Sequence, residues 1–330
     1  MTTLRLKLGA GARDRMTLRK LKLNPVFVVL AMLILAITWY TPSFIEPAGL
    51  MNFLRRAAPL VVLTCGQLFV LVTGGFDLSA GSLVTLTVIG GSLLTLGDPA
   101  MTYPAIAALY AIGLAAGAIN GLVVHRLKVP SIITTLGMLL LLKGTALMWS
   151  GGSPRGYLPD NFRAFGRFVW RDVPVIGIVP VAAVVLVVVV GVAVWLLHAT
   201  NFGRLALAIG DNARAAELAG VGVGRVRVAA FILSALSAVT AGILIGGFAG
   251  VSVDAGDGMD LQAIAAAVIG GVQLLGGRGS VPGAVAGALT LYALFTLLNL
   301  IGLPQPIRES VQGVILIAAA AAAWRQRREA

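Results

Sequence analysis

The stretch VPVIGIVPVAAVVLVVVVGVAVWLL, residues 173–197, contains no charged side chain. In a helix that rises 1.5 Å per residue, about 20 apolar residues cross the roughly 30 Å of hydrocarbon in a bilayer, so this stretch is long enough to span a membrane. Nine other stretches are uncharged or nearly so: 24–45, 57–76, 78–97, 99–124, 129–150, 228–253, 261–277, 279–307 and 310–324. Two of them, 261–277 and 310–324, are marginal in length, which predicts short or tilted helices.

The composition of the whole chain agrees with a membrane protein. Of its 330 residues 58% are hydrophobic and only 12% are charged, with a mean hydropathy of +0.95, whereas a soluble domain has about 25% charged residues. This balance argues against aqueous enzymes and free nucleic-acid binders. Because no alternating barrel pattern is present, we expect an all-α, polytopic transmembrane helical bundle of about ten helices.

The net charge of +12 is explained by topology. If residues 1–23 are cytoplasmic, ten crossings place 17 of the 25 Lys and Arg and 5 of the 13 acidic residues on that side, which satisfies the positive-inside rule. We therefore expect a basic cytoplasmic tail at 1–23, a membrane domain at 24–324 that begins with an uncleaved helix, and a cytoplasmic tail at 325–330. The positive charge is attributed to this topology and not to a nucleic-acid partner.

Glycine is abundant, with 41 residues, and much of it is regularly spaced. It recurs every fourth residue in three rows, which are Gly113, Gly117 and Gly121, then Gly242, Gly246 and Gly250, then Gly283 and Gly287. Such rows make flat helix faces on which a neighbouring helix packs closely. We expect static packing, with sliding of these faces during a transport cycle as the alternative.

The segment TGGFDLSAGS, residues 73–82, interrupts two apolar runs. Gly74 and Gly75 permit backbone angles that break a helix, and Asp77 can accept hydrogen bonds from freed amides at the start of the next helix. Asp77 is therefore interpreted as a helix cap, with a gate or a substrate contact at a broken helix as the alternative.

The longest polar segment on the expected cytoplasmic side is 198–227. Asp211 or Asn212 can cap a short helix that runs through Ala219 and ends at Gly220. Arg214 and Glu217 then share one side of this helix, and an apolar side is formed by Ala215, Leu218 and Ala219. That apolar side either lies on its own bundle or lipid, or docks into a groove of a soluble partner.

Three further features are polar within apolar surroundings. Lys143 is isolated in the run 129–150, and a lysine there either extends to the membrane surface or faces the bundle interior. Thr134 and Thr135 of the same run can bond to a hydroxylated substrate or to their own backbone. An acidic, glycine-rich loop precedes Gln262.

Together these segments resemble the integral-membrane permeases of ABC importers in the ribose/xylose/arabinose class. The similarity covers about residues 50–320, and its motifs lie at 73–82, 120–121, 129–137, 202–204, 208–210, 215–216, 218–220, 263–271 and 276–281. The family's usual Pro-Glu-Ala-Ala-Arg order reads Ala-Arg-Ala-Ala-Glu at 213–217, with the two charges exchanged. This exchange indicates a partner groove with different charge preferences.

The resemblance implies a permease in the bacterial inner membrane that imports a monosaccharide or related polyol. It also implies a dimer with an identical or similar permease, a cytoplasmic ABC ATPase and a periplasmic sugar-binding protein, with no catalytic residue, cofactor or metal in this chain. The residues implied for ATPase coupling are Asp211, Asn212, Arg214, Ala215, Ala216, Glu217, Leu218, Ala219 and Gly220. The residues considered for the substrate path are Gly74, Gly75, Asp77, Asn120, Thr134, Thr135 and Gln262.

Three functions are alternatives to that of a sugar ABC permease. A branched-chain amino acid ABC permease is the nearest, with an amino-acid-binding protein as its partner. An ion-coupled transporter should carry paired ionisable groups within its helices, which only Lys143 and Asp77 approach. A membrane enzyme should carry a metal or nucleophile cluster, whereas His125 and His198 lie at helix ends, remote in sequence from Cys65.

The predicted topology can be tested with a reporter domain that is active only in the cytoplasm. Fused after Ala330, the reporter should be active, because ten crossings return the chain to the side of its N-terminus. Fused after Gly156, in an expected external loop, it should be inactive. An inactive reporter after Ala330 would contradict the ten-helix count.

Overall fold

The computed structural model of the chain describes residues 24–174, 177–304, 306–308, 310–311, 313–314 and 317. The predicted tails at 1–23 and 325–330, and most of the tenth apolar run at 310–324, lie outside these residues. The cytoplasmic placement of both termini therefore stays a prediction.

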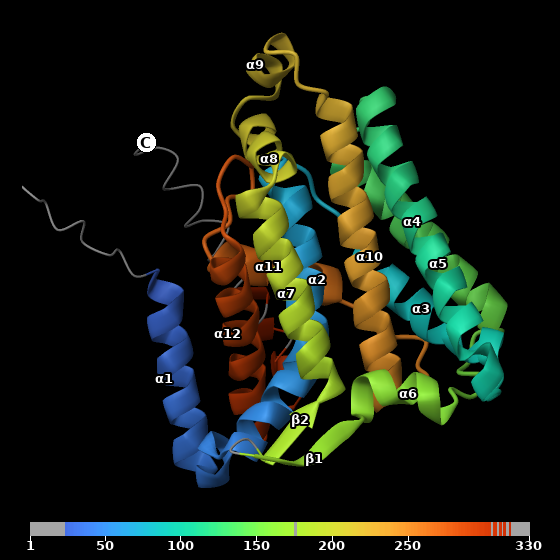
Figure 1. Cartoon of the computed structure of the whole chain (residues 1–330), viewed down its shortest axis with the longest axis vertical. Coiled ribbons are helices and arrows are strands. Elements are labelled where there is room, and N and C mark those ends of the chain that lie inside the picture. Colours follow the sequence, from blue (N-terminus) through green and yellow to red (C-terminus); the bar gives the residue numbers. More distant parts are fainter. Residues whose placement is uncertain are drawn as a thin grey trace, which may run out of the picture.

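The described chain is a bundle of long helices that lie side by side (Figure 1). Its helices are α1 (Pro25–Tyr40), η1 (Pro42–Ile45), α2 (Pro47–Val72), α3 (Ala80–Thr95), η2 (Pro99–Met101), α4 (Thr102–Arg126), α5 (Ser131–Ser150), α6 (Asp160–Arg167), α7 (Val181–Ala199), α8 (Asn201–Asp211), α9 (Ala213–Leu218), α10 (Val223–Ala249), α11 (Met259–Ile269) and α12 (Val281–Leu300). The short helix α9 projects at one end of the bundle, and α6 lies near the opposite end with the strands β1 (Val169–Val173) and β2 (Gly177–Pro180).

The expectation of about ten crossing helices is confirmed only in part. Within the described ranges, six helices are long and apolar enough to cross a membrane: α2, α4 with its preceding turn, α5, α7, α10 and α12. The apolar helices α1, α3 and α11 are shorter, with 16, 16 and 11 residues. The run 261–277 is helical only as far as Ile269, because the chain turns at Gly270 and Gly271, where the backbone of Gly270 touches that of Gly283.

A two-stranded antiparallel sheet was not expected in an all-α chain. β1 pairs with β2, with Val169 opposite Pro180. The apolar run 173–197 therefore begins in a hairpin and becomes helical only at Val181. Pro174 and Pro180 explain the difference, since proline lacks the N–H that a helix interior requires and Pro180 is instead the cap residue of α7.

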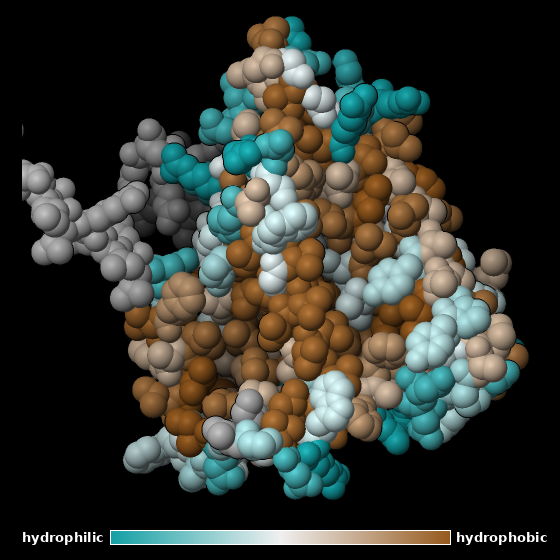
Figure 2. Space-filling model, in the orientation of Figure 1, coloured by the Kyte–Doolittle hydropathy of each residue, from teal (hydrophilic) through white to brown (hydrophobic). Residues whose placement is uncertain are grey.

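The outer surface of the bundle is apolar over its middle, and hydrophilic residues gather toward its ends (Figure 2). Large apolar side chains on its outer helices are exposed, among them Leu35 of α1, Leu140 of α5 and Val187 of α7. This pattern fits a bilayer, in which exposed hydrocarbon is solvated by lipid chains.

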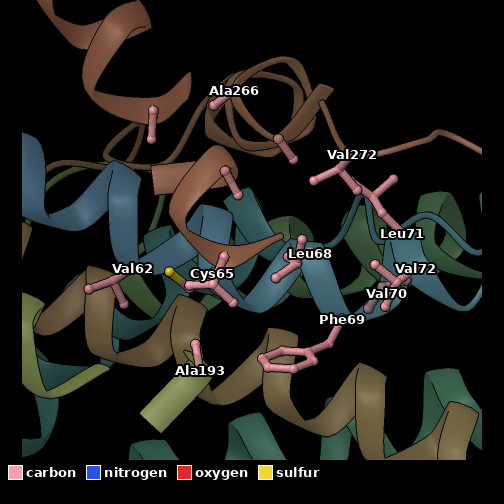
Figure 3. Close-up of a cluster of buried hydrophobic side chains, with 14 of the residues drawn as sticks. Val62, Cys65, Leu68, Phe69, Val70, Leu71, Val72, Ala193, Ala266 and Val272 are labelled. Carbon is pink, nitrogen blue, oxygen red and sulfur yellow. The ribbon is translucent and has the colours of Figure 1, made fainter. Parts of the chain in front are cut away.

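Helix α2 is the central helix and is almost entirely buried along its apolar length. Figure 3 shows Cys65, Leu68 and Phe69 of this helix among Ala193 of α7 and Ala266 of α11. Because lipid chains are as apolar as these side chains, close packing and not hydrophobicity holds such helices together.

The glycine rows support the packing interpretation. A Cβ atom added to Gly117 of α4 would lie 2.7 Å from the Phe231 carbonyl oxygen and 2.8 Å from the Ile232 Cα atom of α10. Gly121 also meets backbone of α10, at the Val228 Cα atom, and Gly113 meets the Val239 side chain, whereas Gly250 lies beyond the end of α10 with nothing within 4 Å. The α4 row is therefore a helix-to-helix contact along its whole length.

Replacing Gly117 with alanine should destabilise the bundle, because its new Cβ meets backbone atoms of α10 that cannot rotate away. We expect a loss of about 1–3 kcal/mol, as is typical of overpacking. The control is Gly144→Ala on α5, where nothing lies within 4 Å, and this change should be neutral or stabilising. Thermal unfolding of both variants in one detergent checks the prediction, and equal midpoints would contradict it.

Candidate functional site

The break between α2 and α3 is the first part of the candidate site. Helix α2 ends at Val72, and Gly74 follows with a φ of +81°, a left-handed conformation that side chains other than glycine rarely adopt. The amide of Gly74 donates to the Leu71 carbonyl at 2.9 Å, and the amide of Gly75 donates to that of Val70 at 3.1 Å. The two glycines thus close the last turn of α2 and redirect the chain.

Asp77 organises the start of α3. Its side chain is only 1% exposed, and its Oδ1 atom accepts from the Ser79 amide at 3.0 Å and from the Ser79 hydroxyl at 2.6 Å. The same hydroxyl accepts from the Asn120 amide of α4 at 3.0 Å. The prediction that Asp77 caps α3 is wrong in its position, because the N-cap residue is Ser79 and no side chain in the described part of the chain caps the first amides of α3. Asp77 instead holds the N-cap residue in place through its amide and its hydroxyl.

Two side chains that were not among the predicted site residues, Gln67 and Ser131, hold the backbone of the break. The buried amide of Gln67 on α2, oriented to satisfy both groups, donates to the Asp77 carbonyl at 3.2 Å and accepts from its amide at 3.1 Å. The Phe76 amide donates to the Ser131 hydroxyl at 3.1 Å. A signal for Gln67 existed, since it is an uncharged polar residue within the apolar run 57–76.

The acidic loop between α10 and α11 packs against the first turns of α3. The Gly256 amide donates to the Thr85 hydroxyl at 3.0 Å, and a Cβ atom on Gly81 would lie 3.0 Å from Oδ1 of Asp260. A second carboxylate, Asp260, therefore stands beside the α3 N-terminus, where the helix dipole favours negative charge. Gln262 lies half-buried in the first turn of α11.

Lys143 has a specific partner in this loop. Its ammonium group lies 2.9 Å from the Asp257 carboxylate, and the two side chains are 36% and 45% exposed. Neither of the two expected placements foresaw this ion pair, because the partner is 114 residues away in sequence. The pair joins the outer face of α5 to the acidic loop.

The polar segment 198–227 forms the second part of the site, with α8 followed by the short helix α9. Asn212, and not Asp211, caps α9 by accepting from the Ala215 amide at 2.9 Å, while Asp211 is the last residue of α8. Arg214 and Glu217 form the expected ion pair, at 2.9 Å.

The two sides of α9 differ sharply in exposure. Ala216 is buried against the bundle, whereas Leu218 is 74% exposed. Ala215 and Ala219 are also exposed, and Gly220 follows with a φ of +82°. Ala216 thus anchors α9 to its own chain, and the exposed apolar side chains point outward.

A backbone joint connects the two parts of the site. The Gly277 amide donates to the Val72 carbonyl at 3.0 Å, at the last residue of α2. Gly210, near the end of α8, packs so tightly here that an added Cβ would collide with the Val72 carbonyl and the Gly277 amide. The segment 198–227 therefore touches the end of α2 directly, one residue before the break begins.

A cavity of about 480 Å³ opens where the break meets α9. Gly74 and Gly75 line it together with Arg214 and Glu217, and Phe231 of α10 also contributes. Residues predicted for the substrate path and residues predicted for ATPase coupling, which are far apart in sequence, thus line one cavity.

The other substrate-path residues lie elsewhere. Asp77, Asn120 and Thr135 are buried and bonded within the chain, Thr135 donating to the Ser131 carbonyl at 2.9 Å. Thr134 donates to the carbonyl of Pro130 at 3.3 Å, which is the backbone alternative foreseen for it. Of the predicted set, Gly74 and Gly75 are the ones that line the cavity next to α9.

Comparisons with known proteins give a consistent result. A family described as "Branched-chain amino acid transport system / permease component" matches residues 49–320. The chain is 36% identical over 303 residues to the ribose import permease protein RbsC of Bacillus subtilis, which covers 90% of this chain and 91% of the relative. It is 36% identical over 301 residues to the autoinducer 2 import system permease protein LsrC of Klebsiella pneumoniae, which covers 91% of this chain and 85% of that protein. No solved structure matches the chain.

The role of Asp77 can be tested by two substitutions. Asp77→Ala leaves the Ser79 amide without its acceptor in a buried site and should cost about 1–3 kcal/mol of stability, whereas Asp77→Asn keeps an acceptor oxygen and should cost less. The control Asp254→Ala removes an exposed carboxylate and should have no effect. Thermal unfolding in detergent checks the order, and an unchanged midpoint for Asp77→Ala would show that its bonds to Ser79 do not stabilise the break.

Proposed function

The chain belongs to the family of transport-system permease components that these relatives represent, and we propose that it imports a sugar or a sugar-like solute. It is a multi-pass membrane protein and a permease subunit of an ABC importer. The family description names branched-chain amino acids, but relatives that match about 90% of the chain are named for the import of ribose and autoinducer 2. The sugar class is therefore favoured over the amino acid class.

We propose that α9 is the coupling helix that docks into the cytoplasmic ATPase. The observation that carries this proposal is the position of α9, which projects from one end of the bundle with Leu218 largely exposed (Figure 1). An exposed leucine on a helix held rigidly by its own cap and by buried Ala216 is suited to enter a groove on a partner. The Arg214–Glu217 ion pair would then lie beside that groove.

The proposed energy coupling runs from α9 to the break. When ATP closes the ATPase, the docked α9 moves, and the contact of Gly210 with Val72 and Gly277 carries that motion to the end of α2. Gly74 and Gly75, which shape the cavity beside α9, shift with it. ATP drives transport in this scheme through its different affinity for the two access states, so the permease itself needs no catalytic group.

We propose that the solute passes between two permease chains, which are either identical or similar. The support is the half-exposed Lys143–Asp257 ion pair on the outer face of α5, among exposed apolar side chains such as Leu140 and Leu141. An ion pair that faces lipid is costly, whereas one that faces a water-filled path is not. A periplasmic binding protein would deliver the solute at the end opposite α9.

Replacing Leu218 with aspartate should abolish co-purification of the ATPase and uptake of the solute. The change places a charge on the proposed docking surface but leaves membrane insertion intact, because Leu218 is 74% exposed and contributes little to the core. Co-purification with the tagged permease and uptake into cells or proteoliposomes measure the two effects.

The matched control is Leu96→Asp, since Leu96 is 71% exposed and follows α3 at a site remote from α9. The control should keep the ATPase bound. Normal uptake and ATPase binding in the Leu218→Asp variant would overturn the assignment of α9.

A further inference from the structure

A second large cavity, of about 580 Å³, lies at the opposite end of the bundle from α9, between α2, α12 and η1. Its lining includes Arg55, Arg56 and Arg308, and no carboxylate is among the lining residues that the structure describes. Phe44, Phe53 and Tyr292 supply aromatic walls. The cavity is therefore strongly basic on one side and apolar on the other.

Two arginines of this cavity have N–H groups without a hydrogen-bond partner among the described residues. Arg308 donates from Nη1 to the Asn299 side chain at 3.1 Å, but within the described chain the Nε atoms of Arg55 and Arg308 are buried without a hydrogen-bond partner. Burying such donors unpaired is costly, and adjacent cationic groups repel one another. A bound anion would remove both costs, and phosphate oxygens suit the forked guanidinium group.

The level of the cavity in the membrane is marked by aromatic residues. Trp39 and Tyr40 end α1 and are 88% and 60% exposed, as is typical of side chains in the headgroup layer. Phe44 follows them directly and lines the cavity.

The charge pattern along α2 places the arginines close to the same level. Helix α2 has 26 residues, about 39 Å, which exceeds the roughly 30 Å hydrocarbon layer, so its first turns extend into the headgroups. Arg55 and Arg56 lie in the third turn, about 12 Å from the start of α2, and no charged residue follows them in the helix, which places them at the boundary of the hydrocarbon layer. Asn299 lies at the end of α12.

We propose that this cavity binds the phosphate group of an anionic phospholipid. The phosphate contacts Arg55, Arg56 and Arg308, the aromatic walls pack against the glycerol and the first acyl carbons, and the acyl chains continue along the exposed apolar face of neighbouring α1. A lipid is the occupant because the cavity lies at headgroup level beside a helix whose outward side chains, such as Leu35, are solvated by lipid. This site is independent of the solute that the permease carries.

The test uses the full chain, stripped of lipid in detergent and examined by native mass spectrometry with phosphatidylglycerol or phosphatidylcholine of identical acyl chains. Phosphatidylglycerol should bind about tenfold more tightly than phosphatidylcholine, and the double variant Arg55→Gln, Arg56→Gln should lose that preference, because each basic residue near a headgroup adds attraction. The control variant Arg126→Gln, Arg204→Gln lacks two exposed arginines that are remote from the cavity. It should keep the preference for phosphatidylglycerol.

A variant that keeps the positive charge shows whether a lost lipid preference comes from the lost charge or from misfolding. Arg55→Lys, Arg56→Lys should retain most of the preference for phosphatidylglycerol. If the double glutamine variant does not fold, the single change Arg56→Gln, at an exposed position, serves in its place and should weaken the preference.

Three results would overturn the proposal. The first is equal binding of the two lipids by the unchanged chain, and the second is an unchanged preference in the glutamine variants. The third is displacement of phosphatidylglycerol by equimolar glycerol 3-phosphate, which would identify a soluble phosphate as the ligand. If the glutamine variants keep their lipid preference but no longer bind the periplasmic binding protein, the second result applies. The arginines would then bind an acidic surface of that protein and not a lipid.

Discussion

Every backbone N–H and C=O that leaves a helix inside a bilayer must find another partner, because no water is there to replace the lost bond. The break between α2 and α3 is where this chain meets that requirement. Gln67 bonds both backbone groups of Asp77, Ser131 bonds the Phe76 amide, and the Asp77 carboxylate bonds the Ser79 amide. Gln67 belongs to α2 and Ser131 to α5, and Asn120 of α4 donates to the Ser79 hydroxyl, so the break also fixes how α2, α4 and α5 stand relative to one another.

The features that could be predicted from the sequence are those that depend on neighbouring residues, and the features that depend on distant residues could not be predicted. Local signals were reliable: the apolar runs, the cap of α9 and the helix-breaking glycines each depend on a few neighbouring residues. The hairpin of β1 and β2 was missed because the run 173–197 was judged by its apolar content alone, although Pro174 and Pro180 divide it. Similarly, helix α11 ends at Ile269 because the chain turns at Gly270 and Gly271, a local glycine pair inside the apolar run 261–277 that apolar content alone does not reveal.

The sequence could indicate which polar residues are unusual in their surroundings but not what each of them contacts. Asp77, Asn120 and Thr135 are polar residues in apolar surroundings, and sequence alone cannot distinguish a side chain that faces a solute from one that satisfies the backbone. The structure assigns these three to internal hydrogen bonds. Lys143 illustrates the same limit, since its partner Asp257 is distant in sequence and was considered only as part of an acidic loop.

The joint at Gly210 has a mechanical consequence. Where side chains separate two helices, they can change rotamer and absorb part of a displacement, but at this joint backbone rests on backbone at Val72 and Gly277. The two backbones cannot come closer together at this contact. A displacement of α8 toward α2 therefore meets backbone atoms that cannot rotate away and moves α2 with it. A displacement of α8 away from α2 is opposed only by the weaker attraction between the two surfaces, so the contact transmits motion mainly in one direction.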